Sequence, residues 1–356
     1  MIIRRGGEKY ELPILNSAYP TNVTQLEKSG GSATFNVVIA TPGKPAEYTY
    51  QWYVNGSKVS GATGSSYTKT GLTSAATYTV YCEVTNKAGT VQSRIATLTV
   101  QSSQPVYTYS GSHELIKENT YNWKIKLKST GNLKFTHLGN CTGLIDVFLV
   151  GGGAGGSNNT NYNTGGGGGG GGRTTNTTAN IQTGVTYAIT VGGGGSPDGG
   201  GGQTSAFSKT AAGGSASSTA HHGGSGGSGG GGAGWSHDLY AGVGGSNGGS
   251  GGAGAGSNYS TGAGAGQGTT TKEFGSGTLY AGGGAGGAGI SNGDVLGPCI
   301  SGGSGGGGRG AGSGGAAGAG TANTGGGGGG SRARVSHLGN SAASGGSGIV
   351  VIRNHR

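Results

Sequence analysis

The feature that most constrains the fold of this chain is the glycine-rich region at residues 151–348. Of the 92 glycines in the chain, 78 fall in residues 151–356, and many form unbroken tracts such as Gly165–Gly172. Glycine has no side chain to bury and loses more backbone freedom on folding than any other residue, so such tracts cannot build an ordinary core. A flexible linker is therefore one interpretation of this region.

The apolar segments around the region favour an ordered interpretation instead. Leu144–Val150 precedes it, Ile349–Ile352 follows it, and Val185–Val191 lies inside it. Glycine runs can form extended threefold helices of the polyproline II type, which lack internal hydrogen bonds and must bond to neighbouring segments. Such segments pack closely because they carry no side chains, and Cα–H···O contacts support them. A strict three-residue glycine period is absent and the chain has only 7 prolines, which argues against collagen.

Charge and hydropathy exclude several partner classes. The 22 Lys+Arg outnumber the 12 Asp+Glu, for a formal net charge of +10, but only 10% of residues are charged. Lys124, Lys126 and Lys128 alternate at period two, which predicts the solvated face of a strand and not a nucleic-acid site. No apolar run approaches the roughly 20 residues of a membrane helix. The first residues lack the apolar core of a secretory signal, so we expect synthesis in a cytoplasm and no export by that route.

The cysteines predict neither a disulfide framework nor a zinc site. Cys82, Cys141 and Cys299 are odd in number, widely spaced and form no CxxC pair. We expect small buried hydrophobic residues in a chain that folds under reducing conditions.

Catalytic and cofactor motifs are also missing from the sequence. It contains no GxxxxGK[ST] loop, and GxGxxG matches carry no information in this composition. The acids after residue 150 are few and scattered: Asp198, Asp238, Glu273 and Asp294. His221 and His222 could hold a metal with His237, but adjacent histidines in an extended chain point apart. We predict no enzyme, no catalytic residue, no cofactor and no metal.

Residues 19–101 have the pattern of an all-β domain after an N-terminal arm at residues 1–18. Period-two segments separated by turn signals such as Asn55-Gly56 predict a sandwich. The expected strands are Ala33–Ile39, Tyr48–Val54, Ser66–Thr70, Ala76–Val84 and Arg94–Val100.

The motifs Tyr50–Gly56 and Tyr81–Asn86 resemble bacterial and phage immunoglobulin-like domains. The resemblance implies that Trp52 is the buried tryptophan of strand C and that Cys82 is the second cysteine of the fold. Valines stand where strand B would carry the first cysteine, so no disulfide is expected. Domains of this kind act as spacers or as weak carbohydrate-binding modules, and the spacer role is favoured.

A linker at residues 102–106 leads into a second domain at residues 107–356. Apolar segments there predict a small β-sheet that anchors both ends of the glycine region and offsets the entropy of glycine in the unfolded chain. They are Val106–Tyr109, Tyr121–Leu127, Gly131–Thr136, Leu144–Val150, Val185–Val191 and Ile349–Ile352.

The order of these segments is similar to the glycine-rich domain of phage tail-associated proteins. The shared features are Leu144–Gly156, the glycines after Thr164, Tyr187–Gly193 and the terminal Gly346–Arg353. The plan is also analogous to the distal tail-fibre adhesins of T-even-type phages, in which polyglycine II helices support receptor-binding loops. The resemblance implies that function lies in the inserts between glycine tracts.

Those inserts carry aromatic residues beside short polar ones, a composition typical of rigid binding loops. The receptor-binding candidates are Trp235, His237, Tyr240, Tyr259, Phe274 and Tyr280. The competing interpretation is that Trp235, Tyr240, Phe274 and Tyr280 form small packing clusters at the ends of the glycine helices.

The sequence therefore predicts an all-β chain, in which an immunoglobulin-like sandwich is followed by a small β-sheet domain enclosing a packed polyglycine II helix bundle. The expected function is that of a bacteriophage virion protein, a tail or fibre-tip adhesin. Its partners would be other virion proteins, bound through the arm and first domain, and a host cell-surface glycan or protein; a homo-oligomer is compatible. The alternatives are a purely structural tail, baseplate or head-fibre component, or a bacterial glycine-rich surface protein.

Overall fold

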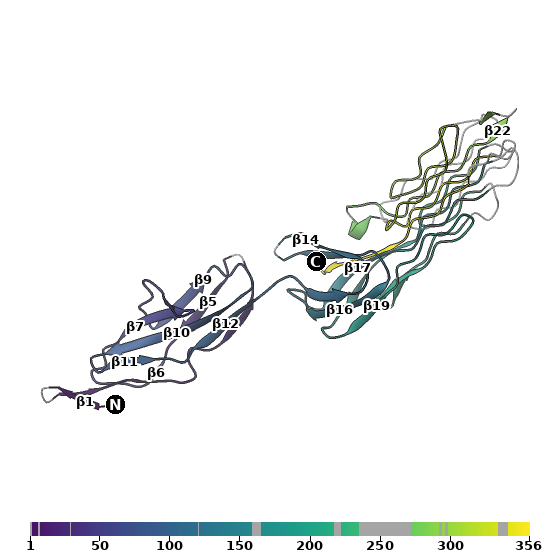
Figure 1. Cartoon of the computed structure of the whole chain (residues 1–356). Coiled ribbons are helices and arrows are strands. Elements are labelled where there is room, and N and C mark those ends of the chain that lie inside the picture. The colour runs from purple at the N-terminus through teal and green to yellow at the C-terminus, as the bar shows by residue number, and fades with distance from the viewer. Residues whose placement is uncertain are drawn as a thin grey trace. The chain divides into compact units, whose positions relative to one another are not determined.

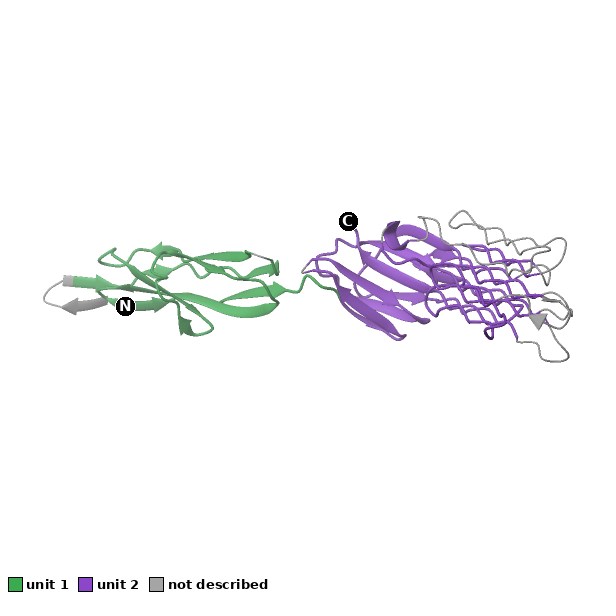
Figure 2. Cartoon of the chain, turned by 90° about the horizontal axis from the view of Figure 1, so that it is seen from above, with its two compact units in different colours: residues 1–105 green, residues 106–356 purple. Residues whose placement is uncertain are grey.

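The computed structural model describes residues 2–5, 8–28, 30–119, 121–158, 165–216, 222–234, 272–275, 277–291, 294–295, 298–333 and 341–356. Regular structure in these ranges consists of strands and one 3₁₀ turn, η2 (Glu273–Gly275), which confirms the prediction of an all-β chain. The chain divides into two compact units, residues 1–105 and residues 106–356 (Figure 2).

Unit 1 is built on a six-stranded sheet. The strands run in the order β4 (Val23–Leu26), β12 (Ala96–Gln101), β10 (Ala76–Asn86), β7 (Thr49–Val54) and β8 (Ser57–Lys58), and β11 (Gly89–Gln92) also pairs with β10. Three further pairs are β5 (Ser32–Asn36) with β9 (Ser66–Thr70), β3 (Ile14–Leu15) with β6 (Ile39–Thr41), and β1 (Ile2–Arg5) with β2 (Glu8–Glu11).

The core of unit 1 lies between the six-stranded sheet and the β5–β9 pair. Trp52 on β7 and Cys82 on β10 are fully buried partners in the sheet, and Phe35 on β5 packs into the same cluster. The Trp52 indole Nε1 donates a hydrogen bond of 2.9 Å to the carbonyl of Gly64, so the buried ring leaves no polar atom unpaired. All three cysteines of the chain are free.

The start of the chain is more closely joined to unit 1 than the prediction of a separate arm implies. β3 pairs with β6, and Glu11 forms an antiparallel bridge with Lys44. The short strands β3, β4, β8 and β11 lack a clear apolar alternation, which is why the sequence pattern did not predict them.

Unit 2 is built on two main sheets, where the sequence predicted one. The three-stranded sheet has the order β13 (Val106–Tyr109), β16 (Gly131–His137), β19 (Thr186–Ile189). The five-stranded sheet has the order β14 (His113–Lys117), β15 (Trp123–Leu127), β24 (Ile349–Asn354), β17 (Leu144–Val150), β18 (Thr174–Asn180). The six predicted apolar segments all form strands, and they divide between the two sheets because each sheet has an apolar face to cover.

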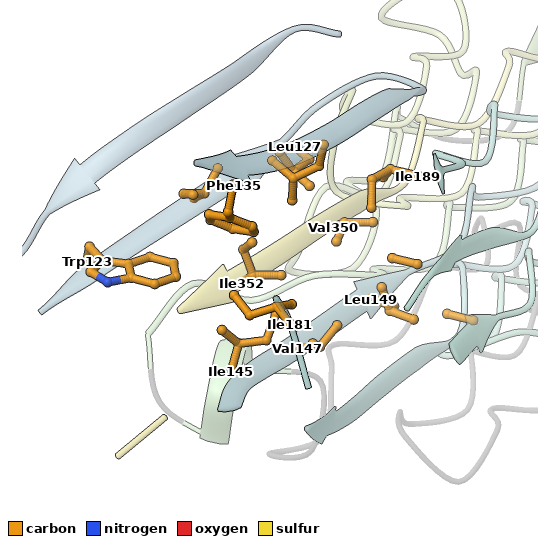
Figure 3. Packing of buried hydrophobic residues seen from close by; sticks show 14 residues of the cluster. Trp123, Leu127, Phe135, Ile145, Val147, Leu149, Ile181, Ile189, Val350 and Ile352 are labelled. Atoms are coloured by element: carbon orange, nitrogen blue, oxygen red, sulfur yellow. The ribbon is translucent and has the colours of Figure 1, made fainter. Parts of the chain in front are cut away.

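The main core of unit 2 lies between these sheets. Leu133 and Phe135 of the three-stranded sheet meet Ile125, Val147 and Ile352 of the five-stranded sheet, all fully buried (Figure 3). β17 and β24 are buried on both faces, since Phe148 and Val351 on their other face belong to a second apolar cluster. This burial explains the uninterrupted apolar runs Val147–Val150 in β17 and Ile349–Ile352 in β24.

The described glycine-rich segments continue from the sheets and lie side by side (Figure 1); we call them the glycine stack. Each successive amide of the first segment donates to a different neighbour, and the three neighbours recur in turn. Gly152, Gly153 and Ala154 donate to the carbonyls of Gly202, Gly346 and Gly170, and Gly155, Gly156 and Ser157 donate to those of Gly199, Ala343 and Gly167, all at 2.8–2.9 Å.

The same three-residue step recurs in the second segment. Gly166, Gly169 and Gly172 donate to the carbonyls of Ser331, Gly328 and Gly325, and Gly165, Gly168 and Gly171 donate to those of Gly234, Gly231 and Ser228. Hydrogen bonds therefore leave each segment in three directions, unlike those of a strand, which lie in the plane of one sheet.

Most glycines of the stack are required by close packing. A Cβ built on Gly153 would lie 2.0 Å from the carbonyl oxygen of Gly326, and one on Gly168 would lie 2.2 Å from that of Gly284. Real Cβ atoms do not approach that closely, so only glycine fits at these positions.

The stack has a sheet end and a far end. At the sheet end Gly151 bonds to Arg173, directly between β17 and β18. At the far end Ser157 donates to Gly167 and accepts from Ser331, and Asn158 accepts a hydrogen bond from the amide of Ala342. The short pair β22 (Ile290–Ser291) and β23 (Asp294–Val295) follows the segment that ends near Ala288, at this same end (Figure 1).

Candidate functional site

Four of the six predicted receptor-binding residues lie outside the described residues: Trp235, His237, Tyr240 and Tyr259. The structure does describe the residue that precedes the first of them. The amide of Gly165 donates to the carbonyl of Gly234, and the amide of Gly234 donates to Gly287, which places residue 234 at the far end of the stack. The insert that carries these candidates therefore begins at the far end.

The other two candidates, Phe274 and Tyr280, lie against the five-stranded sheet. Tyr280 is 2% exposed and packs on Phe148, with 5.2 Å between the ring centroids. Phe274 is half-buried, 6.1 Å from the Phe148 ring, and its face carries the guanidinium of Arg353 at 4.2 Å. Both rings therefore contact Phe148 of the five-stranded sheet.

A buried carboxylate holds the chain at this point. Glu273, 4% exposed, accepts hydrogen bonds from Lys124 Nζ at 2.5 Å and from the Tyr280 hydroxyl at 2.8 Å, and Lys126 Nζ lies 3.8 Å away. Burial, followed by the nearby Glu273 charge, raises the pKa of Tyr280 well above its usual range, so the phenol stays protonated and donates. Glu273 therefore fixes the return of the 235–271 insert to the sheet.

Lys124 and Lys126 differ from the sequence prediction. The period-two pattern predicted a solvated strand face, but both lysines are partly covered and point toward Glu273. Lys128 is more exposed and pairs with Glu114 at 2.7 Å. The prediction failed because the segment that covers the first two lysines is separated from them by about 150 residues of sequence, a distance over which strand periodicity carries no information.

Next to this contact, the C-terminal residues form a second ionic cluster. Asp146 accepts hydrogen bonds from Arg353 Nε at 2.8 Å and contacts His355 Nδ1 at 2.5 Å. Arg356 pairs with Glu118. Burial opposes ionisation of Glu118, but the Arg356 hydrogen bond and charge lower the pKa of its carboxyl overall. An open cavity of about 400 Å³ lies beside Asp146, Phe274, Arg353 and Arg356.

The acids of these two clusters face cations within the described ranges. Each acid is paired with a cation, and no group of three or more His, Cys, Asp or Glu side chains in the described ranges could hold a metal ion. Of the three histidines considered for a metal, only His222 is described. No helix within the described ranges is both long and apolar enough to cross a membrane. The arrangement is suited to holding segments in place.

The far end has its own polar cluster, which the sequence analysis did not predict. Asp198 Oδ1 accepts hydrogen bonds from the Ser157 hydroxyl at 3.1 Å and from the Asn158 amide at 2.9 Å. Asp198 has a φ of 64° in the turn between two glycine segments, a conformation that Asp tolerates better than most residues. The sequence Pro197-Asp198-Gly199, a common turn signature, was the available sequence signal for this turn.

No curated protein sequence matches the chain significantly. The glycine-rich domain family matches residues 128–355, which is well over half of the 356 residues. The matched range begins just after β15 and includes the glycine stack and β24. The chain therefore belongs to the glycine-rich domain family.

Proposed function

We propose that this protein is a structural component of a bacteriophage virion, a tail or fibre-tip adhesin whose glycine stack presents host-binding inserts. The main support for the proposal is that several inserts begin at the same end of the stack. Residues 158, 234 and 333, each the last described residue before an insert, lie in segments that meet at the far end of the stack. A stack without side chains has little surface chemistry of its own, so specificity would come from residues at its end.

The bonding of the stack supports polyglycine II helices. An extended helix with three residues per turn directs successive amides about 120° apart, so each amide meets a different neighbour and the fourth meets the first neighbour again. The recurring partners of residues 152–157 have this period. The close approach of glycine Cα atoms to carbonyl oxygens, such as Gly153 to Gly326, is the geometry of Cα–H···O contacts.

The packing of unit 1 supports an immunoglobulin-like spacer. Trp52 and Cys82 are fully buried on neighbouring central strands, and β5 and β9 cover the same cluster from the other side. A spacer with this core could attach to other virion proteins through its N-terminal strands. The protein would be made in the host cytoplasm and act on the assembled particle, alone or as a homo-oligomer.

One observation favours the alternative of a purely structural tail, baseplate or head-fibre component. Phe274 and Tyr280 were candidates for binding, yet both pack on Phe148 of the five-stranded sheet. If the remaining aromatic residues of the inserts also pack, the far end would have no exposed recognition residues. Trp235 and Tyr240 therefore decide between the two functions.

The test uses the whole purified chain in competition with phage for adsorption to host cells. Trp235→Ala and Tyr240→Ala should leave the melting temperature unchanged and weaken cell binding, by about 2 kcal/mol or more for a binding hot spot. Tyr121→Ala is the matched control, because this exposed tyrosine precedes the end of β15 that is remote from the stack. A folded Trp235→Ala/Tyr240→Ala double variant that still blocks phage adsorption as well as the unsubstituted chain would reject the adhesin function. So would an unsubstituted chain that never blocks adsorption.

A further inference from the structure

A second pocket lies at the seam between the two sheets of unit 2. The hairpin of β20 (Thr204–Ala206) and β21 (Lys209–Ala211) closes this seam, since β20 contacts β19 and β21 contacts β18. The pocket has a volume of about 330 Å³ and is lined by Thr178, Asn180, Tyr187, Phe207, Ser208 and Lys209. Ligand pockets begin at about 300 Å³, so the space suits one small ring.

The turn of this hairpin carries two residues that its backbone conformation disfavours. Phe207 and Ser208 have φ values of 51° and 59°, in the left-handed region. Two-residue hairpin turns of this kind favour Asn-Gly, and a bulky aromatic residue with positive φ is an outlier. Strained residues of this sort cluster at binding sites, where the strain holds a side chain in place.

The strained turn brings an aromatic pair to the pocket. The Phe207 and Tyr187 rings are 5.2 Å apart and tilted by 50°, and both are half-buried. The Tyr187 hydroxyl accepts a hydrogen bond of 2.7 Å from the amide of Gln182, which fixes the orientation of that ring. Half-buried ring faces of this kind pack against the C–H groups of a sugar ring.

Polar groups surround the aromatic pair. Asn180 and Ser208 are exposed and offer an amide and a hydroxyl, the hydrogen-bonding groups that pair with sugar hydroxyls. Lys209 is exposed as well, and it makes no ion pair with any acid in the part of the chain that the structure describes. A single cation beside an aromatic pair favours a ligand with one negative charge.

From this geometry we propose that the pocket binds one hexuronate unit, an acidic pyranose sugar, of a host surface polysaccharide. The sugar ring packs on Phe207 and Tyr187, its carboxylate pairs with Lys209, and its hydroxyls bond to Asn180 and Ser208. The inference rests on the proposed function for the origin of the sugar, and it adds a ligand class and a site separate from the far-end inserts.

The experiment is a titration of the full chain with galacturonate, followed by NMR chemical shifts, with galactose and acetate as matched probes. Galacturonate should bind up to about fivefold more tightly than galactose, because its carboxylate adds an ion pair with the exposed Lys209. Acetate should not bind measurably. Lys209→Gln should bring galacturonate down to the affinity of galactose.

Phe207→Asn provides the second test. Asparagine adopts positive φ more readily than phenylalanine, which offsets the packing that the Phe207 ring loses against the main core, so this variant should fold and lose sugar binding. Retained galacturonate affinity in Phe207→Asn, equal affinities for galacturonate and galactose, or acetate binding as tight as galacturonate each overturn the proposal. If Phe207→Asn does not fold, the test rests on Lys209→Gln, a substitution at an exposed position. An unchanged preference of that variant for galacturonate over galactose rejects the site.

These outcomes are distinct from failure of the adhesin function. A chain that blocks adsorption to cells but does not bind galacturonate keeps the proposed function and loses this site. A chain that binds galacturonate but never blocks adsorption keeps the site and loses the proposed function.

Discussion

Replacement of a single stack glycine by alanine is the most direct test of the packing described above. In Gly153→Ala the new Cβ would lie 2.0 Å from the carbonyl oxygen of Gly326, where contacts under 3.0 Å are essentially never seen. That oxygen would have to move by about 1.0 Å, and it accepts a 2.7 Å hydrogen bond from Gly346. The substitution therefore forces overpacking and weakens a hydrogen bond between two other segments.

The magnitude follows from these two effects. Overpacking costs about 1–3 kcal/mol, and leaving a buried amide unpaired costs about 1–3 kcal/mol. Alanine restricts the unfolded chain, which by itself stabilises the folded protein by about 0.4–1 kcal/mol. We expect a net destabilisation of about 3 kcal/mol, which corresponds to roughly 6–12 °C in the melting temperature of a domain of this size.

Gly193→Ala is the matched control, because a Cβ at Gly193 meets nothing within 4 Å. This variant should be stabilised by about 0.4–1 kcal/mol. Calorimetry of the full chain is the assay, and the transition of unit 1 provides an internal reference in each scan. Equal shifts for the two variants, or no shift for Gly153→Ala, would refute the close packing of the stack.

Four other measurements probe separate parts of the structure. Glu273→Gln should destabilise unit 2 by about 1–3 kcal/mol because two partly covered lysines lose their buried partner, whereas Glu114→Gln, at an exposed pair, should change stability by less than about 1 kcal/mol in the same urea titration. Ser228→Ala should stabilise unit 2 by about 1 kcal/mol, since the fully buried Ser228 hydroxyl has no hydrogen-bond partner among the described residues. Burial raises the pKa of the Cys82 thiol from 9.0 to about 11. The contribution of the neutral thiol to the stability of unit 1 is therefore complete below pH 9 and should be lost as the pH rises to about 11. Urea titrations at these two pH values measure the loss, and Cys82→Ala should remove it. Amides of residues 165–172 should resist hydrogen exchange for minutes or longer, and exchange at random-coil rates would restore the interpretation as a linker.

The apolar strands could be predicted from the sequence because buried strand positions require apolar side chains, which gives the sequence a recognisable pattern. Leu144–Val150 and Ile349–Ile352 lack polar alternation, which indicates strands buried on both faces, and β17 and β24 are the strands with apolar clusters on either side. Trp123, Ile125 and Leu127 alternate with lysines, and their side chains form part of the main core. In each case the local pattern and the tertiary environment agree.

The polar strands could not be predicted in the same way. β18 has the sequence Thr-Thr-Asn-Thr-Thr-Ala-Asn and occupies one edge of the five-stranded sheet, where no apolar alternation is needed. β14 occupies the other edge. Without these edge strands the sequence indicated one small sheet, and the division into two sheets became evident only from the pairing.

The sequence says least about the roles of the candidate site residues, for a related reason. An aromatic residue in an insert can bind a ligand or pack on a neighbour, and the amino-acid composition of the insert is the same in both cases. Tyr280 packs because Glu273 returns the chain to the sheet beside Lys124, a contact between residues about 150 positions apart. The strained turn at Phe207 likewise depends on a backbone conformation that its side chain does not reveal.

Glycine alone does not fix the register of the glycine stack, that is, which residues of neighbouring segments lie opposite one another. Because the hydrogen-bond partners of a segment recur every three residues, a slide of three residues would restore most of its lateral hydrogen bonds, and a pure glycine segment has no preferred register. Ala154 supplies one in the first segment. If this segment slid by one residue, the Ala154 methyl would take the place of Gly153 or Gly155, where a Cβ meets a carbonyl oxygen at 2.0 or 1.9 Å. If it slid by three residues toward β17, the methyl would reach the place of Gly151, where the contact is 2.1 Å. Interruptions of the glycine tracts by alanine therefore act as steric markers that fix register, and the strands at the sheet end then determine which segments meet.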